Sequence, residues 1–398
     1  MDARLSRRHF ALLGAAALAV RLLYILVIAR DPVGVGGDAS FYHSAANQLA
    51  DGHFFYREIF GHAYPTALHP PLFSIVLAPV ALLGGVHLGA QRVVGCVIGS
   101  ISVVLIAALG SRVGGRRAGL LAGSVAVVYP PFVTADGSLM SEPLYVLLVT
   151  VALLLAVRRP SSMGRAAALG GTIGLSVLTR TEGALLLVLL AWPATWSPRA
   201  GRGRRVLAAT VACGLVVAPW VIRNEVVFHR FELAGNYSTV IAGANCRQTY
   251  YGHDVGWWSL DCLARSRSRH QLLIGDASTT AGFHYARAHA GRAMLVAVVR
   301  TLRTFSLFQP TRIGNKERRR AWLDVAGLVI YYPLLIAAGV GLVRLPDRRW
   351  LLLAPIASTV LVSATGWGNA RFRVGADVSI IVLASLAVRR DRQPARAG

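Results

Sequence analysis

Residues 37–72 read GDASFYHSAANQLADGHFFYREIFGHAYPTALHPPL, a polar stretch that separates two long apolar segments. Its acids and histidines are Asp38, Asp51, Glu58, His43, His53, His62 and His69. Irregular backbone is not tolerated where it faces lipid, so we expect this stretch at a membrane face or in a protected cavity. It is therefore either a solvated connector or a loop that carries chemistry.

The composition indicates a polytopic membrane protein. Hydrophobic residues make up 55% of the 398 residues, and the mean hydropathy of +0.53 is higher than that of ordinary soluble domains. The formal net charge of +24 would indicate nucleic-acid binding in a soluble protein. Here the arginines lie mostly between apolar segments, so we expect a lipid bilayer, and not nucleic acid, as the partner.

Several apolar segments approach the length of about 20 residues that crosses a bilayer. The predicted spans are residues 10–29, 90–110, 118–131, 142–157, 166–179, 183–197, 206–222, 322–343, 350–366 and 374–388. By the positive-inside rule, the arginine-rich connections at 112–117, 158–165 and 199–205 lie in the cytoplasm, together with both termini. The expected fold is one all-α polytopic domain, residues 1–398, with about ten spans in the plasma membrane.

This topology places two regions outside the cytoplasm, residues 31–89 and residues 223–320. Within them, segments 39–51, 72–86 and 292–308 are expected to form helices at the outer interface. Their polar or proline-containing character separates them from the predicted spans. The sequence leaves open whether 72–86 and 292–308 cross the membrane.

Cysteine and arginine positions give two structural expectations. Cys246 and Cys262 both fall in the larger outer region, where a disulfide is stable. Cys96 and Cys213 lie in apolar segments and are expected to be small core residues. Arg21 lies within the first predicted span, where a charge is costly without a polar partner, so we expect it in a structural ion pair.

Three motifs in the opening stretch resemble a known family. G-D-x-x-x-Y begins at Gly37, A-x-x-L-x-x-G begins at Ala46, and H-P-P-L begins at His69. In this order they resemble the first extracytoplasmic loop of GT-C glycosyltransferases of family 39, which includes protein O-mannosyltransferases and bacterial lipid A aminoarabinose transferases. The resemblance implies a GT-C bundle, an active-site role for Asp38, and a polyprenyl-phosphate sugar as the donor.

Later motifs extend the resemblance along the chain. They are Ser141-Glu142-Pro143, Thr179-Arg180-Thr181-Glu182-Gly183 and Asn369-Ala370-Arg371-Phe372-Arg373. These look like the family's second active-site acid, its T-R/K-x-E-G corner and its E-x-R-Y-R corner. The resemblance therefore implies Asp38 and Glu142 as catalytic residues. It implies a substrate-binding set of His69, Arg180, Glu182, Arg371, Arg373 and Tyr42.

Two of these positions depart from the family pattern. His69 stands where some relatives have lysine, which makes its charge pH-dependent, and Asn369 stands near the usual acid. Each motif also has a structural interpretation. Glu142 is placed to favour a helix dipole, Arg180 and Glu182 are placed to form an ion pair, and the arginines of the last motif are placed to act as interfacial anchors.

The expected function is transfer of one sugar, with inversion, to an extracytoplasmic lipid, cell-wall glycan or protein. Asp38 would act as the general base, while His69 and the arginines would hold the donor phosphate. No metal or cofactor is required by this scheme; the alternative is a divalent cation on the loop histidines, which lack H-x-x-x-H spacing. Competing functions are a polyprenyl-lipid transporter or flippase and a non-catalytic lipid-binding subunit. Sugar, acceptor, linkage and oligomeric state are not legible in the sequence.

Overall fold

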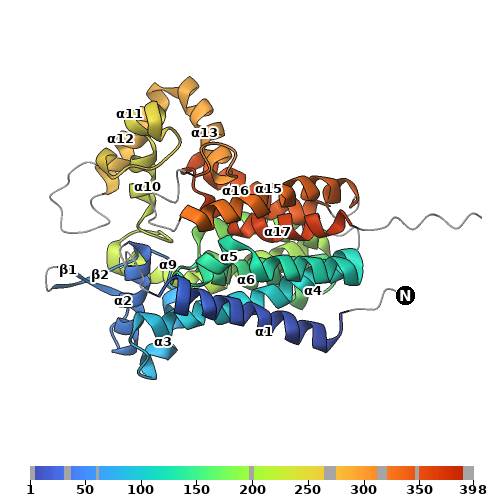
Figure 1. The fold of residues 1–398 in the computed structure, drawn as a ribbon. Helices are drawn as coiled ribbons and strands as arrows, with labels where there is room; N and C mark the ends of the chain where they lie inside the picture. Colours follow the sequence, from blue (N-terminus) through green and yellow to red (C-terminus); the bar gives the residue numbers. More distant parts are fainter. Residues whose placement is uncertain are drawn as a thin grey trace, which may run out of the picture.

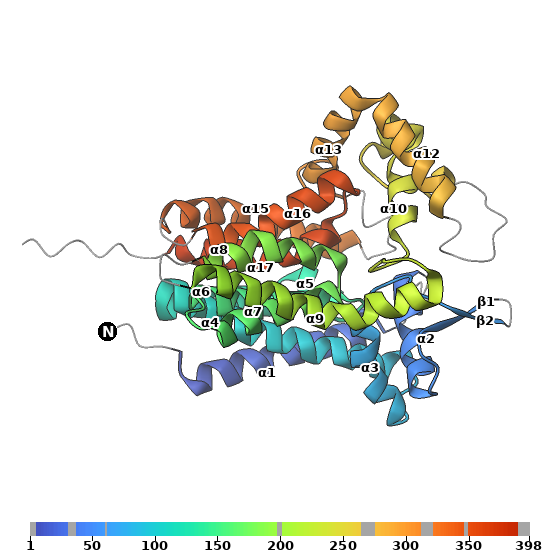
Figure 2. The same cartoon turned by 180° about the vertical axis from the view of Figure 1, so that it is seen from behind.

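The computed structural model is a bundle of long helices with a group of shorter elements gathered at one end (Figure 1). It describes residues 5–30, 37–59, 62–196, 201–263, 275–311, 321–345 and 349–388. The long helices run side by side across the view, and the shorter elements lie to the left of the bundle or above its left end. The view from behind shows the same division (Figure 2).

The bundle is built from the segments that were predicted to span the membrane. Its helices are α1 (Arg7–Leu23), α4 (Leu88–Val128), α5 (Pro130–Asp136), α6 (Glu142–Val157), α7 (Met163–Val177), α8 (Trp192–Thr195), α9 (Arg202–Phe228), α15 (Ala321–Val343), α16 (Arg349–Thr365) and α17 (Val374–Leu386). The π-helical stretch Tyr24–Ile28 extends α1, and another, Leu187–Ala191, precedes α8. Each predicted span is helical over most of its length.

The predicted fold class, an all-α polytopic membrane protein, is confirmed. Within the described ranges, four helices are long and apolar enough to cross a membrane: Arg7–Ile28, Leu88–Val128, Arg202–Phe228 and Trp322–Val343. Shorter apolar helices, including Glu142–Val157 and Arg349–Thr365, lie beside them. Buried apolar side chains of α4, α6, α7, α15, α16 and α17 form the main core.

Helix α4 contains two predicted spans because the chain reverses at Gly115. This residue has φ 84° and ψ −176°, a conformation that glycine adopts without strain. The helix surfaces before and after it touch, since a Cβ added to Gly119 would lie 2.7 Å from the carbonyl oxygen of Ala107. Residues 88–128 are therefore a helical hairpin, with Arg116 and Arg117 beside its turn.

Helix α9 continues beyond its predicted end, which corrects one boundary. The prediction ends this span at residue 222 and begins the outer region at residue 223, whereas the helix runs to Phe228. The guanidinium of Arg223 donates to the backbone oxygens of Thr66 and Phe55, at 3.0 and 3.2 Å. These contacts give the charge protein partners within the fold, so the helix does not end where polar residues begin.

The elements of the two predicted outer regions, called the outer elements below, lie together at one end of the bundle (Figure 1). They are α2 (Asp38–Ala50), α3 (Leu72–Leu82), α10 (Tyr237–Ala244), α11 (Arg247–Tyr250), α12 (Gly275–Ala288) and α13 (Ala290–Thr304). Helices α2, α3 and α13 match the predicted outer helices 39–51, 72–86 and 292–308, and all three are tilted steeply from the bundle direction (Figures 1 and 2).

A β-hairpin in the first outer region was not predicted. Strands β1 (Tyr56–Ile59) and β2 (His62–Pro65) pair antiparallel, with Tyr56 opposite Pro65. Each strand has only four residues, which is too short for an alternation of apolar and polar residues to be recognised in the sequence. The side chain of Glu58, one of the acids noted in the sequence, lies outside the described residues.

Two structural expectations are confirmed. Cys246 and Cys262 form a disulfide, with their Cα atoms 6.0 Å apart, and the two remaining cysteines are free and buried. Arg21 forms an ion pair with Asp136, in which its Nε lies 2.6 Å from Oδ2. This pair joins α1 to the end of α5 in the interior of the bundle.

Candidate active site

Charged side chains from four segments meet at the end of the bundle that carries the outer elements. Asp38 begins α2, and Glu142 begins α6. Glu182 lies in the 3₁₀ turn η2 (Thr181–Ala184), and Arg371 lies in the 3₁₀ turn η6 (Ala370–Arg373). First-turn positions favour acids because helix N-termini carry partial positive charge. The local sequence therefore places both acids at helix starts, and the bundle brings the starts together.

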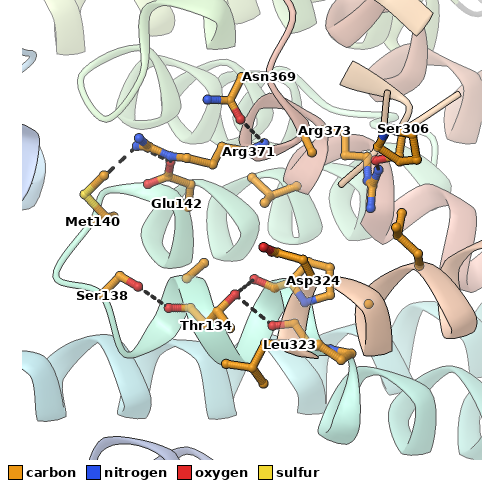
Figure 3. Close-up of a pocket in the computed structure, with 18 residues that line it drawn as sticks. Thr134, Ser138, Met140, Glu142, Ser306, Leu323, Asp324, Asn369, Arg371 and Arg373 are labelled. Carbon is orange, nitrogen blue, oxygen red and sulfur yellow. Dashed lines mark hydrogen bonds and ion pairs between the residues drawn. The ribbon is translucent and has the colours of Figure 1, made fainter. Parts of the chain in front are cut away.

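Arg371 bridges the two acids predicted to be catalytic. Its Nε and Nη2 donate to Oε1 of Glu142, at 2.9 and 2.7 Å, and Nη2 also lies 3.3 Å from Oδ2 of Asp38. Figure 3 shows its guanidinium turned toward Glu142 and Met140. Its partners lie 229 and 333 residues away in the chain. The fold therefore brings these distant motifs together.

Glu142 is held by a second guanidinium. Nη1 of Arg180 lies 3.1 Å from Oε1 of Glu142, and Nε of Arg180 donates to Oε1 of Glu182. The Arg180 guanidinium also stands over the ring of Phe372, 5.5 Å from its centroid. The Glu142 side chain is only 2% exposed, and its buried Oε2 atom has no hydrogen-bond partner among the described residues. One oxygen therefore binds two arginines, while the other binds none of the side chains that the structure describes.

His69 and Asp38 form the outer part of the site. Nε2 of His69 lies 3.4 Å from Oδ1 of Asp38, and its ring packs against Phe41 and Tyr42 with centroids 4.9 and 5.3 Å apart. Burial raises the pKa of Asp38, but the contacts with His69 and Arg371 outweigh it and hold that pKa well below its usual range. The Asp38 side chain remains 40% exposed, so it is both ionised and accessible.

Tyr42 is placed behind the site rather than in it. The residue is 3% exposed, and its ring packs edge-on against Phe73 with centroids 5.1 Å apart. Burial raises the pKa of its hydroxyl, which also bonds to Ser141. Tyr42 therefore supports His69 and the start of α6, and this geometry does not favour the predicted contact with substrate.

Arg373 points away from the acids that bind Arg371 (Figure 3). Its Nε lies 3.2 Å from Oδ1 of Asp377, one turn further along α17, and its guanidinium stands 3.7 Å from the ring centroid of Tyr331. The side chain is almost fully buried. Two arginines only two residues apart thus differ completely in surroundings, and Arg371 alone faces the predicted catalytic acids.

Two further acids of the described residues do not join the site. Asp136 is buried against Arg21, and Asp51 is exposed at the end of α2. Among the described residues, no group of three or more histidines, cysteines and acids could hold a metal ion. The expectation that no cofactor is needed stays a prediction.

A pocket adjoins Glu142 and Arg371 on the side of α5 and α15 (Figure 3). Its polar lining includes Thr134, Ser138, Asp324 and Asn369, and its apolar lining includes Pro130, Pro131, Leu323 and Leu328. Sequence reasoning missed this pocket because its walls come from α5, α15 and η6, which are distant in the chain. Asn369, noted only as a departure from the family, is fully buried and accepts a hydrogen bond from the Arg371 backbone N–H at 3.0 Å.

Comparisons with known proteins concern the sequence and the fold of this chain. Residues 68–222 match the family described as dolichyl-phosphate-mannose-protein mannosyltransferase, a region that contains His69, Glu142, Arg180 and Glu182. No curated protein matches the chain significantly.

Among solved structures, the chain is similar to the archaeal oligosaccharyltransferase AglB from Archaeoglobus fulgidus in complex with an inhibitory peptide and a dolichol-phosphate. The TM-score is 0.56 at 14% identity, over 96% of this chain and 50% of AglB. The chain has the GT-C fold. The zinc and sulfate complex of the Archaeoglobus fulgidus oligosaccharyltransferase matches with TM-score 0.56 and 15% identity, over 95% of this chain and 48% of that enzyme.

ArnT from Cupriavidus metallidurans, bound to undecaprenyl phosphate, gives a TM-score of 0.48 at 16% identity, over 95% of this chain and 77% of ArnT. The chain spans about half the length of the archaeal oligosaccharyltransferases that it matches.

Proposed function

We propose that this GT-C protein is a glycosyltransferase that moves one sugar from a polyprenyl-phosphate donor to an acceptor outside the cytoplasm. The observation that carries the proposal is the cluster in which Arg371 joins Asp38 to Glu142. The match to the dolichyl-phosphate-mannose family and the dolichol-phosphate bound by AglB support a polyprenyl-phosphate donor. A lipid-linked donor also explains why the site lies at the end of a membrane bundle.

Asp38 is proposed as the general base. The acceptor oxygen attacks the anomeric carbon, the bond from that carbon to the phosphate oxygen breaks, and the acceptor proton passes to a carboxylate oxygen of Asp38. Polyprenyl phosphate leaves with the electron pair. Because attack and departure take place on opposite faces of the carbon, the anomeric configuration is inverted. The exposed position of Asp38 lets an acceptor hydroxyl reach it.

Arg371 and His69 are proposed to bind the donor phosphate. Both already contact Asp38, and the contact of Arg371 with Asp38, at 3.3 Å, is longer than its two contacts with Glu142. A phosphate would therefore replace Asp38 as a partner of Arg371 most easily. That exchange would raise the pKa of Asp38 from its lowered value, because it removes one of the contacts that favour the ionised form. Donor binding would thus make Asp38 a better proton acceptor.

Glu142 is proposed to orient a substrate hydroxyl in the pocket. Its buried Oε2 lacks a partner, and such an atom gains most from a hydrogen-bond donor supplied by a ligand. Arg180, with Glu182 behind it, is proposed to act by holding Glu142 in place rather than by touching the phosphate.

The predicted topology suggests on which side of the membrane the Asp38 site lies. Arg116 near the α4 turn and Arg158 after α6 belong to connections that the positive-inside rule places in the cytoplasm. The Asp38 site would then face outward, and both termini would be cytoplasmic in the plasma membrane. A membrane-impermeant thiol reagent tests this proposal: it should label a cysteine placed at Ala39 in intact cells and should not label one placed at Gly203.

The activity is tested by incubating membranes with radiolabelled undecaprenyl-phosphate sugars. Membranes from cells that produce the chain should pass label from one of these donors to a lipid, glycan or protein, and membranes from cells without it should not. Retention of all label on the polyprenyl phosphate, together with tight binding of the same lipid, would instead favour a carrier or a binding subunit.

A further inference from the structure

A loop closed by a disulfide lies against the segment that carries Arg371. The loop runs from Cys246 to Cys262, and the segment is residues 366–373, between α16 and α17. The backbone N–H of Gly368 donates to the carbonyl oxygen of Gly256 at 2.9 Å. This hydrogen bond joins the middle of the disulfide loop to the chain just before η6.

Aromatic rings continue the contact toward the active site. The ring of Trp367 packs edge-on against that of Trp257, with centroids 5.2 Å apart, and lies 6.3 Å from that of Trp258. Trp367 also packs edge-on against Phe372, at 4.9 Å, the ring over which Arg180 stands. Trp367 therefore connects the loop with the residue next to Arg371.

Both backbones approach α13 so closely that the contact needs glycine. Gly256 has φ 78°, and a Cβ there would lie 2.9 Å from Cγ1 of Val299. A Cβ on Gly368 would lie 2.6 Å from the carbonyl oxygen of Arg300. At such distances a side chain on Gly256 or Gly368 would push its own segment away from α13.

Helix α13 holds the loop from the other side. Nε of Arg303 donates to the carbonyl oxygen of Val255 at 2.6 Å, and Nη2 of Arg300 donates to Oδ1 of Asn245 at 3.1 Å. The same helix binds the segment before η6, because the N–H of Asn369 donates to Oγ1 of Thr304 at 3.2 Å. The loop, α13 and η6 thus form one packed unit next to the site.

We propose that the disulfide loop holds Arg371 in its active position, with Trp367 as the positioning residue, and that reduction of the disulfide lowers transfer. This inference rests on the proposed function. A dithiol supplies two electrons and two protons: the sulfur–sulfur bond breaks, each cysteine becomes a thiol, and the dithiol closes to its own disulfide. None of the side chains that touch substrate is altered, so the effect passes through the position of η6.

The test uses the purified full-length chain with and without dithiothreitol. Hydrogen exchange of a peptide covering residues 366–373 is measured beside one from α17, together with transfer from radiolabelled undecaprenyl-phosphate sugar. Reduction should speed exchange in the first peptide, leave the second unchanged, and lower kcat/KM by about tenfold. The variant with Cys246→Ser and Cys262→Ser should show the low value with or without dithiothreitol, which controls for effects on the two buried cysteines.

Two variants of Trp367 complete the test. Trp367→Phe keeps a ring against Trp257 and should retain most activity, whereas Trp367→Ala should resemble the reduced protein in both exchange and kcat/KM. Unchanged exchange in residues 366–373 after reduction would overturn the inference, and so would faster exchange with an unchanged kcat/KM. If the oxidised protein transfers no sugar, the proposed function fails, while the exchange measurement still decides whether the loop orders η6.

Discussion

Two charged clusters join distant parts of this chain, and they differ in how completely they are closed. In the Arg21–Asp136 pair the side chains are 1% and 5% exposed, and Nη1 and Nη2 of Arg21 bond to backbone oxygens of Ala17, Val127 and Ala126. In the Arg371 cluster, Asp38 is 40% exposed, and one buried oxygen of Glu142 has no hydrogen-bond partner in the part of the chain that the structure describes.

This difference in exposure and hydrogen bonding indicates a structural role for the Arg21–Asp136 pair and agrees with the functional role proposed for the Arg371 cluster. Gly99 on α4 leaves room for Asp136, since a Cβ there would lie 1.9 Å from its Oδ2, so the closed pair is built into helix packing. A closed pair has no capacity to bind anything else. The open cluster retains an exposed carboxylate and, among the described residues, an unsatisfied acceptor; polar groups held in that state are candidates for binding a ligand.

The largest expected effect on stability comes from breaking the closed pair. Asp136→Asn should lower the free energy of unfolding by about 3–5 kcal/mol, because it leaves the Arg21 charge buried without compensation. Unfolding in detergent measures this, with Asp51→Asn as the control, since Asp51 is exposed and its substitution should change stability by less than about 0.5 kcal/mol. Equal stability of the two variants would contradict the structural role of Asp136.

Arg371 and Arg373 allow the same comparison between an open and a closed charged group. Arg371→Ala should weaken binding of undecaprenyl phosphate by about 10–150-fold, corresponding to about 1.5–3 kcal/mol for a charge-assisted contact, with little change in melting temperature. Arg373→Ala should mainly destabilise the protein, because it leaves the buried Asp377 carboxylate without its ion-pair partner. Binding by isothermal titration and melting by fluorescence distinguish the two. Collapse of the Arg371→Ala fold would show that this cluster is also structural.

The pocket beside the open cluster can be filled without touching its charges. Gly327 on α15 lines it, and a Cβ there would meet only proline atoms, the nearest at 3.7 Å. Gly327→Leu should therefore fill the pocket and lower transfer by about tenfold. Gly339→Leu is the matched control, because Gly339 lies on the same helix with open space around it, and it should leave transfer unchanged. Normal transfer by Gly327→Leu would exclude the pocket from substrate binding.

The smallest expected effect concerns pH. His69 and Arg371 lower the pKa of Asp38 against burial, so its carboxylate persists below its ordinary range, and activity that depends on it is lost only as pH falls through the lowered pKa. His69→Phe keeps the ring packing but removes one lowering contact, so the acidic limb of kcat/KM should move to higher pH. His53→Phe, at an exposed position, serves as the control. If the acidic limb of the kcat/KM profile does not move, His69 does not lower the pKa of Asp38.

Most helices of the bundle could be predicted from the sequence, because a membrane span is visible as a long apolar run. The end of α9 was misplaced since Arg223 bonds to backbone of a distant loop, a contact that polarity alone cannot show. The β-hairpin was missed because its strands are four residues long. Tertiary contacts thus decided the features that local patterns did not.

The site shows the same limit. Motif order grouped Asp38, Glu142, Arg180 and Arg371, which the structure brings together. The sequence motifs treated Arg371 and Arg373 alike, because a sequence does not reveal which acid pairs with which arginine. The pocket behind Glu142 has walls from three distant segments, so no single motif could have predicted it.

The central claim is that Asp38 accepts the acceptor proton. The decisive measurement is the transfer rate of Asp38→Asn at saturating donor, with undecaprenyl phosphate affinity measured on the same preparation. Asparagine keeps the shape and can still cap the start of α2, but it cannot take a proton. The account predicts retained affinity and a rate lower by at least about a hundredfold, as general-base catalysis supplies roughly 10²–10⁴-fold. Near-normal turnover by this variant would contradict it.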